Sequence, residues 1–317
     1  MRIIHGLRSL KNPIKASALT IGVFDGVHIG HRKIIEKAVA CARVKGLEAV
    51  VVTFDPHPSG VLSPSKKVPS LISLDHRLNL FNRLGVDTTV IIKFAKPFAE
   101  MSPENFVRNI LIGKLGARFI YVGENFLFGN SASADFRALR RIASPYGINV
   151  ASVSPVKVSG EMVSSSSIRK YVISGKLNKA KRLLGRPVSV LGTVIKGARF
   201  ARVLGYPTAN INPHHEVIPP AGVYAVKVRI GKDVRGGVLN IGKRPTFYAP
   251  RDEEPDIEAH IFDFKSRVYG KEIEVLFLKK IRSEKRFKDA GALVRQIKKD
   301  TKRALQMTDN MIRSTKQ

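Results

Sequence analysis

Gly22-Val-Phe-Asp-Gly-Val-His-Ile-Gly-His31 is the stretch that decides the fold of the first half of this chain. It follows an apolar run, Ala18–Ile21, which predicts a buried strand, and it leads into a helical pattern over Lys33–Val44. Strand, glycine-rich turn and helix together predict a phosphate site, because glycines allow close backbone approach and a helix start offers free N–H groups. The paired histidines add donors that can face one polyphosphate, which suits transfer of a nucleotidyl group. The alternative is a corner whose histidines only cap the helix.

Length and composition indicate a soluble, globular protein of two domains. The chain has 317 residues, of which 44% are hydrophobic and 25% charged. Its single cysteine, Cys41, excludes an intrachain disulfide and a cysteine-rich zinc site. We find no apolar run long enough to span a membrane and no secretory signal at Met1–His5, so we expect a cytoplasmic protein.

The net charge of +30 comes from 55 basic and 25 acidic residues, spread over both halves of the chain. A nucleic-acid reader is expected to concentrate such charge and to interleave it with aromatic residues. Aromatic residues make up only 7% of the chain, and the basic runs, such as Lys179–Arg182, are short. We therefore expect no specific nucleic-acid partner. Anionic substrates or a general attraction to polyanions remain open as explanations.

The first half alternates between strand and helix patterns. Strands are predicted at Ala49–Phe54, Thr88–Phe94 and Arg118–Val122. Between and after them, helical patterns cover Leu74–Leu84, Glu104–Leu115 and the serine-rich stretch Ser164–Leu184. This βαβ alternation predicts an α/β fold with a doubly wound parallel sheet, whose ligands bind at the carboxyl ends of the strands.

The pattern changes beyond Gly185–Pro187. Short alternating strands separated by turns are expected at Val188–Val194, Val223–Ile230, Arg235–Ile241, Ile257–Phe262 and Ile273–Phe277. They predict a small antiparallel β-barrel, followed by an amphipathic helix over Asp289–Met311. The predicted domains are therefore residues 1–185 and 186–317.

Two further motifs carry chemistry in the first half. Val122–Gly129 follows a predicted strand, so Asn125 is expected at the same sheet edge as the histidines; the alternative is a turn with core phenylalanines. Ser164–Arg169 opens a helix with four hydroxyls and a guanidinium, a set suited to an outgoing pyrophosphate, although one serine would suffice for a plain cap. The candidate ligands there are Ser164, Ser165, Ser166 and Arg169. Asp55–Pro58 indicates a turn rather than catalysis.

The second half has its own phosphate chemistry. A glycine-rich flap is predicted to begin at Gly192–Gly197. It leads to the turn Pro207-Thr-Ala-Asn210. The oxygens of Thr208 and Asn210, two residues apart, can hold Mg²⁺ against ATP phosphates. Glu258, on an alternating strand, can take a proton from an attacking hydroxyl. The alternatives are an ordinary turn at Pro207 and a surface glutamate. Two phosphate sites predict two sequential transfers.

Together these residues resemble the bacterial bifunctional riboflavin kinase/FAD synthetase family over nearly the whole chain. The motifs that carry the resemblance in the first half are Gly22–His31, Thr53–Pro58, Val122–Gly129 and Ser164–Arg169. Those in the second half are Gly192–Gly197, Pro207–Asn210, Pro219–Tyr224, Asn240–Thr246, Glu258–Phe264 and Arg282–Phe287. The order of motifs is the family's order, and the motif around Thr208 and the later glutamate are its most specific parts.

The resemblance implies an FMN adenylyltransferase in the first half, in which the phosphate of FMN attacks the α-phosphorus of ATP to give FAD and pyrophosphate. His28 and His31 would stabilise the developing charge, and the Ser164–Arg169 motif would hold the leaving pyrophosphate. The further residues implied in binding the nucleotide are Gly22, Phe24, Asp25, Gly30 and Asn125, the last of which would contact nucleotide or flavin.

The resemblance implies a riboflavin kinase in the second half. Glu258 would activate the ribityl hydroxyl of riboflavin for attack on the γ-phosphorus of ATP. The nucleotide and Mg²⁺ would bind at Thr208 and Asn210, with Gly197 and Arg202 from the flap. Arg282 and Phe287 would close the flavin site. The implied substrates are riboflavin, FMN and ATP, with no membrane partner, and the oligomeric state is not predicted.

Three positions depart from the family's pattern: Ser166 stands where threonine is usual, and Ala134 and Ala201 stand where glycine is usual. A chain with only one active module, or a basic regulator that binds flavin or nucleic acid, is therefore an alternative. Class I aminoacyl-tRNA synthetases share the His-Ile-Gly-His spelling of residues 28–31, but their Lys-Met-Ser-Lys-Ser loop has no counterpart in this sequence.

Overall fold

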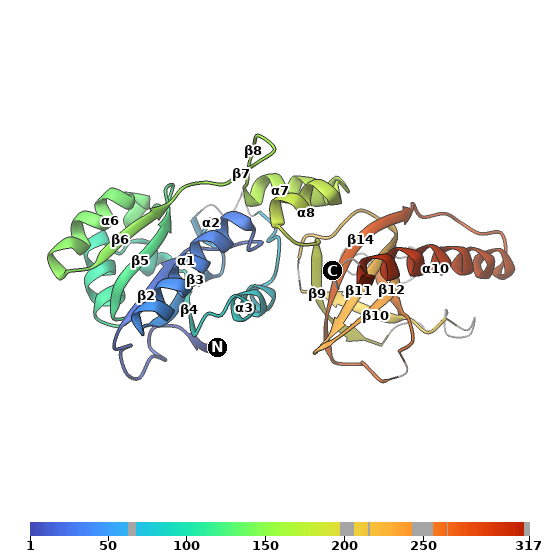
Figure 1. Cartoon of the computed structure of the whole chain (residues 1–317), viewed down its shortest axis with the longest axis horizontal. Helices are drawn as coiled ribbons and strands as arrows, with labels where there is room; N and C mark the ends of the chain where they lie inside the picture. The colour runs from blue at the N-terminus through green and yellow to red at the C-terminus, as the bar shows by residue number, and fades with distance from the viewer. Residues whose placement is uncertain (63–67, 197–205, 215, 243–255, 265, 314–317) are drawn as a thin grey trace. The chain divides into compact units, whose positions relative to one another are not determined.

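The computed structural model describes the chain except for residues 63–67, 197–205, 215, 243–255, 265 and 314–317. The chain forms two compact units, whose elements are labelled in Figure 1. The first unit contains Met1–Ser70 and Leu74–Ser165, and the second contains Leu71–Ser73 and Ser166–Gln317.

The first unit is built on a six-stranded sheet in which all neighbouring strands are parallel. Its strands are β1 (Arg2–His5), β2 (Ser17–Ile21), β3 (Glu48–Asp55), β4 (Thr88–Lys93), β5 (Ala117–Gly123) and β6 (Asn149–Val153). Their spatial order is β1-β4-β3-β2-β5-β6, so the strand order reverses between β2 and β5. This confirms the predicted doubly wound sheet. In such sheets the crevice at the carboxyl ends of the two central strands binds ligands.

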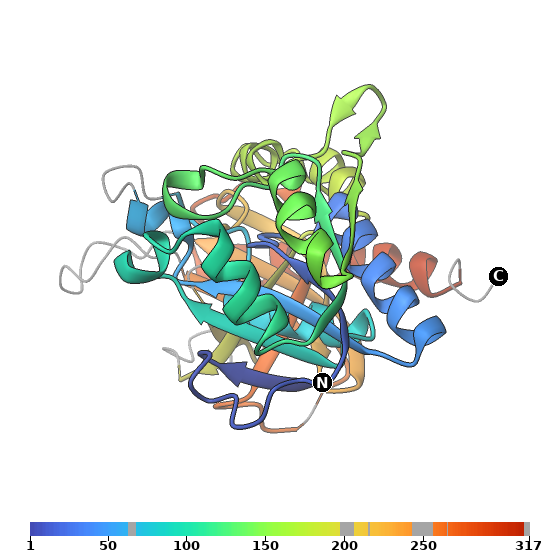
Figure 2. The ribbon, with the colours of Figure 1, turned by 90° about the vertical axis from the view of Figure 1, so that its left-hand side faces the viewer.

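Helices cover both faces of this sheet (Figure 2). Ala18 of β2 packs with Ala42 of α1 (Ile29–Lys45), whereas Leu19 belongs to the core that includes Val107 of the π-helix η2 (Phe106–Ile112). Because successive strand residues point to opposite faces, α1 and η2 lie on opposite sides. The unit also contains α2 (Pro58–Leu62), α3 (Leu74–Arg83), α4 (Lys96–Ala99), α5 (Pro103–Asn105), η3 (Asn130–Ala132), α6 (Phe136–Ala143), η4 (Ser144–Tyr146) and the hairpin strands β7 (Lys157–Val158) and β8 (Glu161–Met162).

Two helical predictions differ from the structure in their detail. The helix expected over Glu104–Leu115 is the short α5 followed by η2, whose wider turns continue to the bond from the Leu115 N–H to the Ile110 carbonyl at 2.9 Å. The single helix expected over Ser164–Leu184 is two helices, α7 (Ser165–Ile173) and α8 (Leu177–Leu184). Gly175 between them has a φ of +70°, a left-handed conformation that ends helices at glycine.

The second unit contains a closed antiparallel barrel with the strand order β10-β13-β12-β11-β14-β9, which confirms the predicted barrel. Its strands are β9 (Ser189–Ile195), β10 (Ala209–Pro213), β11 (Gly222–Ile230), β12 (Asp233–Gly242), β13 (Asp256–Ile261) and β14 (Glu272–Arg282). The expected turn that ends at Asn210 was wrong in part, because Ala209 and Asn210 begin β10. Asn210 pairs with Glu258 on one side and with Ile195 on the other.

The final helix, α10 (Ala290–Arg313), packs against β11, β12 and β14. Its first turn is capped by Asp289, whose carboxylate accepts a hydrogen bond from the Ala292 N–H at 2.6 Å. The fully buried Ala225 and Ala304 form a cluster with Phe262, so small side chains allow helix and barrel to approach closely. The predicted terminal helix is confirmed.

Candidate active sites

The loop from β2 to α1 turns through left-handed backbone at three residues. φ is +53° at Phe24, +85° at Gly26 and +39° at Val27. Two of these residues have a Cβ, which makes the conformation unfavourable by roughly 1–3 kcal/mol each, and such strain persists only where surrounding contacts enforce it. Phe24 is 3% exposed, and its ring meets the ring of His31 edge-on at 5.4 Å between centroids. Phe24 therefore supports His31 from the core.

His28 and His31 form a stacked pair at the start of α1. Their ring centroids are 3.5 Å apart and their planes differ by 20°. The Nδ1 atom of His28 accepts a hydrogen bond from the His31 backbone N–H at 3.2 Å, so the proton of neutral His28 is on Nε2. The Nδ1 atom of His31 is buried and has no hydrogen-bond partner within the described part of the chain.

Burial determines the charge of this pair. It lowers the pKa of His28 to about 4. Burial, and then the neighbouring His28, lower the pKa of His31 well below its ordinary value. Both rings are neutral near pH 7 in the ligand-free protein, so they can donate hydrogen bonds to phosphate oxygens but carry no permanent positive charge.

Two of the predicted glycines lie where a side chain would collide with this arrangement. A Cβ on Gly30 would lie 3.2 Å from the ring of His28, and a Cβ on Gly22 would lie 2.9 Å from the ring of Phe24. The glycines therefore let the loop pack against its own aromatic side chains, a role that sequence reasoning had assigned to the approach of a ligand.

Arg77 is the residue of this site that sequence reasoning missed. It projects from α3, is 6% exposed, and its Nη1 donates to the Val23 carbonyl at 2.7 Å and to the Thr53 hydroxyl at 3.1 Å. Burial lowers the pKa of Arg77, while Asp25 and Asp55 act in the opposite sense. Arg77 thus connects the ends of β2 and β3 behind the histidine loop. The helical pattern of the sequence around Arg77 did not indicate that this residue is buried at the site, because an arginine in an amphipathic helix is ordinarily exposed.

Asp25 connects the loop to the serine-rich motif. Asp25 is 4% exposed, and its backbone carbonyl accepts a hydrogen bond from the Ser165 hydroxyl at 2.8 Å. Ser164 precedes α7, and Ser166 and Arg169 belong to the second unit, in which Ser166 is exposed and Arg169 half-buried. Ser165 therefore lies at the loop, and the phosphate role of the other members of the motif stays a prediction.

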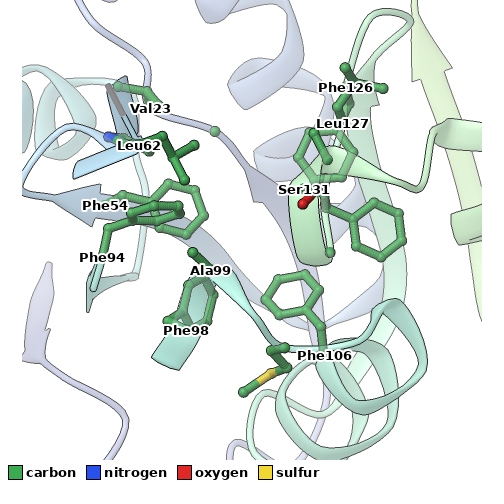
Figure 3. A pocket seen from close by; sticks show the side chains of 16 residues that line it. Val23, Phe54, Leu62, Phe94, Phe98, Ala99, Phe106, Phe126, Leu127 and Ser131 are labelled. Carbon is green, nitrogen blue, oxygen red and sulfur yellow. The ribbon is translucent and has the colours of Figure 1, made fainter. Parts of the chain in front are cut away.

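An apolar cavity of about 420 Å³ lies beside the loop, at the carboxyl ends of the strands (Figure 3). It begins at Gly22 and Val23, and six of its sixteen lining residues are phenylalanines. These are Phe54, Phe94, Phe98, Phe106, Phe126 and Phe128. The size and aromatic lining suit a flat heteroaromatic ring.

The motif after β5 divides between two roles. Asn125 lies exposed in the turn and does not line the cavity, whereas Phe126 and Phe128 do. Ala134, where the resemblance led us to expect glycine, is 3% exposed and pairs with Phe128 through the backbone. Its φ is not among the positive values of the described residues, so alanine is accommodated there without strain of that kind.

The candidate site of the second unit is built on three adjacent strands. In the barrel, Glu258 of β13 lies directly beside Asn210 of β10 on one side and beside Asn240 of β12 on the other. Directly paired residues point to the same face of a sheet, so a carboxylate lies between two amides. Burial, and then the negative charge of Asp256, raise the pKa of Glu258. A raised pKa brings a carboxylate closer to the strength that a general base needs near neutral pH.

Four residues predicted for the second site line one cavity of about 330 Å³: Thr208, Glu258, Arg282 and Phe287. Arg282 is held in place by Asp300 of α10, whose carboxylate accepts from Arg282 Nε at 2.8 Å. The guanidinium of Arg282 lies 5.7 Å from the ring centre of Phe287, in cation–π range. Asp300 and Asn240 also line the cavity and had not been chosen individually from the sequence.

Two predicted flap residues, Gly197 and Arg202, lie outside the described residues, as does Ala201. The same holds for residues 243–246 of the motif that begins at Asn240.

Comparison with known proteins gives a consistent answer over both halves. The family model described as FAD synthetase matches residues 11–167, and the one described as riboflavin kinase matches residues 184–308. A bifunctional riboflavin kinase/FMN adenylyltransferase of Bacillus subtilis (strain 168) is 36% identical over 314 residues, covering 98% of each chain. The protein of the same description from Escherichia coli (strain K12) is 34% identical over 302 residues, covering 95% of this chain and 96% of its own.

A solved structure described as a macrolide-efflux protein from Streptococcus pneumoniae also resembles this chain. It superimposes with a TM-score of 0.81 and is 29% identical, covering 95% of this chain and 98% of that one. Within the described residues of this chain, no helix has both the length and the apolar character needed to cross a membrane.

Proposed function

Because this chain belongs to the bifunctional riboflavin kinase/FMN adenylyltransferase family, we propose that it makes FAD from riboflavin in two steps on separate modules. Residues 186–317 phosphorylate riboflavin with ATP, and residues 1–185 transfer the adenylyl group of a second ATP to FMN. The observation that carries the proposal is that Thr208, Glu258, Arg282 and Phe287, each chosen from the sequence, line one cavity.

In the kinase step, Glu258 takes the proton of the terminal ribityl hydroxyl as its oxygen attacks the γ-phosphorus of ATP, and ADP leaves. The raised pKa of Glu258 supports this role. Arg282 and Phe287 hold the flavin, and Asp300 fixes the direction of Arg282.

Thr208 and Asn210 fit a site for Mg²⁺. Thr208 lines the cavity of the second unit, and Asn210 pairs directly with Glu258, which lines the same cavity. The two residues offer a hydroxyl and an amide carbonyl. Mg²⁺ commonly takes few protein ligands and completes its shell with phosphate oxygens and water. When bound, the ion supplies charge neutralisation to the ATP phosphates.

In the adenylyltransferase step, a phosphate oxygen of FMN attacks the α-phosphorus of ATP, and the bond to the β-phosphate breaks to release pyrophosphate. The neutral His28 and His31 donate hydrogen bonds to the reacting phosphate, in keeping with the buried, unpartnered Nδ1 of His31. The serines of the Ser164–Arg169 motif and its arginine receive the pyrophosphate. We assign the apolar cavity beside Gly22 to the isoalloxazine ring of FMN.

The experiment follows flavins by chromatography after addition of riboflavin, ATP and Mg²⁺. Wild-type protein is expected to form FMN and then FAD. Glu258→Gln should form no FMN from riboflavin yet still convert supplied FMN to FAD, and His28→Asn should accumulate FMN. Glu272→Gln and His5→Asn, both at exposed positions, serve as matched controls. Wild-type protein that forms only one product would show a single active module, and protein that binds flavin but forms neither would support the regulator instead.

We propose the cytoplasm as the compartment of this protein, where ATP is available.

A further inference from the structure

The apolar cavity of the first unit has a hydroxyl in its wall. Among the described residues that line it, Ser131 alone has a side chain that ends in a hydrogen-bonding group. Figure 3 shows the Ser131 oxygen pointing into the space between the phenylalanine rings. Ser131 is exposed, and its hydroxyl makes no hydrogen bond to any residue in the described part of the chain. A single polar group in an aromatic cavity fixes the orientation of a ligand rather than most of its affinity.

The backbone that presents this hydroxyl is strained. Ser131 has φ +53° and ψ +27°, and Ala132 follows with φ +55°, so two consecutive residues with a Cβ adopt the left-handed conformation. Glycine would adopt this conformation without steric conflict. Strained residues of this kind persist where neighbouring contacts enforce them, and they cluster at ligand sites.

The contacts that enforce the strain come from the loop itself. Phe128 and Ala134 exchange two backbone hydrogen bonds, of 2.9 and 3.1 Å, which close the loop at its base. The Ser133 hydroxyl donates to the Asn130 side-chain oxygen at 3.2 Å and so is used within the loop. The loop is therefore fixed by its own bonds, and the Ser131 hydroxyl is left for the cavity.

We propose that Ser131 determines the specificity of the adenylyltransferase for the flavin ring, by a hydrogen bond to the heteroatom edge of the isoalloxazine. This inference rests on the proposed function, which assigns the ring to this cavity. A wall of phenylalanines accepts any flat apolar ring, whereas an isoalloxazine has an apolar dimethylbenzene half and a half with carbonyl and nitrogen atoms. A hydroxyl presented by this closed loop favours a ring with such an edge, because a ring without one covers the hydroxyl and leaves it unsatisfied.

The test compares Ser131→Ala and Ser131→Gly with Ser144→Ala, a control at an exposed serine of the same unit that does not line the cavity. At saturating ATP, both substitutions of Ser131 should raise the KM for FMN by about 2- to 10-fold, the usual worth of one hydrogen bond. The kcat, the KM for ATP and the riboflavin kinase rate should be unchanged. Fluorescence titration of FMN without ATP should show the same weakening.

Ser131→Ala removes the hydroxyl alone, whereas Ser131→Gly removes the hydroxyl and relieves the backbone strain, so the two variants together separate these effects. If only Ser131→Ala weakened FMN binding, the effect would come from the backbone and the proposal would be overturned. Wild-type affinity for FMN in both variants would overturn it too. Failure of the proposed function has a different signature, because wild-type protein would then form no FAD from FMN whatever the residue at position 131.

Discussion

Replacing Arg77 by methionine should disable the adenylyltransferase while sparing the kinase. Methionine fills a similar length of space but cannot donate the hydrogen bonds to the Val23 carbonyl, at 2.7 Å, and to the Thr53 hydroxyl, at 3.1 Å. A hydrogen bond from a charged group contributes about 1.5–3 kcal/mol, so losing both should lower the free energy of unfolding by about 3–5 kcal/mol. The Thr53 hydroxyl keeps its bond to the same carbonyl at 3.2 Å, which places the expected value at the lower end.

The loss of activity should exceed the loss of stability. Val23 begins the loop that ends at His28, and a shift of about 1 Å in a reacting group can cost roughly 100-fold in rate. We therefore expect FAD formation from FMN to fall by about that factor in Arg77→Met. Arg77→Lys, which keeps the charge but cannot bridge two strand ends, should lie between methionine and wild type.

The assay measures FAD formation from FMN and FMN formation from riboflavin on the same preparation, with thermal unfolding alongside. The kinase rate serves as an internal control, because the kinase residues belong to the other compact unit. Arg83→Met removes an exposed arginine of the same helix and should leave both rates unchanged. The reasoning is refuted if Arg77→Met unfolds like wild type and forms FAD within threefold of the wild-type rate.

Three further predictions test other parts of the two sites. The free energy of unfolding of the ligand-free protein should fall by about 3 kcal/mol between pH 6.5 and pH 4. The reason is that unfolded His28 binds a proton at pH 6.5, whereas the folded residue resists protonation down to about pH 4. Urea unfolding measured against pH should show a smaller decline in His28→Gln and the same decline in His5→Gln. Gly30→Ala places a Cβ 3.2 Å from the His28 ring and should slow FAD formation by roughly 10- to 100-fold at an unchanged kinase rate; equal rates would contradict the close packing. Asp300→Asn removes the charge that holds Arg282, at 2.8 Å, and should raise the KM for riboflavin roughly tenfold with FAD formation from FMN unaffected, as steady-state kinetics on each substrate would show.

The strands that were predicted correctly are those whose pattern is local. Ala49–Phe54 is apolar except for Thr53 because both of its faces are covered by other parts of the unit, and all six of its residues are buried. β10 was missed for the opposite reason. It is five residues long, follows a proline motif typical of a turn, and is a strand because β9 and β13 pair with it on both sides. Pairing partners distant in sequence leave no periodicity in the strand itself.

The same distinction applies to the sites. His28, His31, Thr208 and Glu258 were predicted as site residues because each belongs to a short motif with a chemical reason for its spacing. Arg77 lies some fifty residues from the loop that it supports, and only the packing of α3 turns it inward. Asp300 reaches Arg282 from a helix that follows the barrel. Residues that position other residues carry no spacing of their own, so a single sequence does not reveal them.

Backbone strain marks the part of the site that local sequence reasoning could not reach. Six non-glycine residues in the described chain have positive φ, and four of them, Phe24, Val27, Ser131 and Ala132, lie in the loops that follow the central strands β2 and β5. None of these four residues has the side chain that usually indicates a left-handed turn, since glycine, asparagine and aspartate are the common choices there. The conformation is instead imposed by contacts such as the Phe24–His31 ring pair and the closed base of the loop from Phe128 to Ala134. Tertiary contacts thus override local preference in both loops, and the cavity lies between them, with Gly22 and Val23 on one side and Ser131 and Ala132 on the other, so the strained backbone and the cavity mark the same crevice.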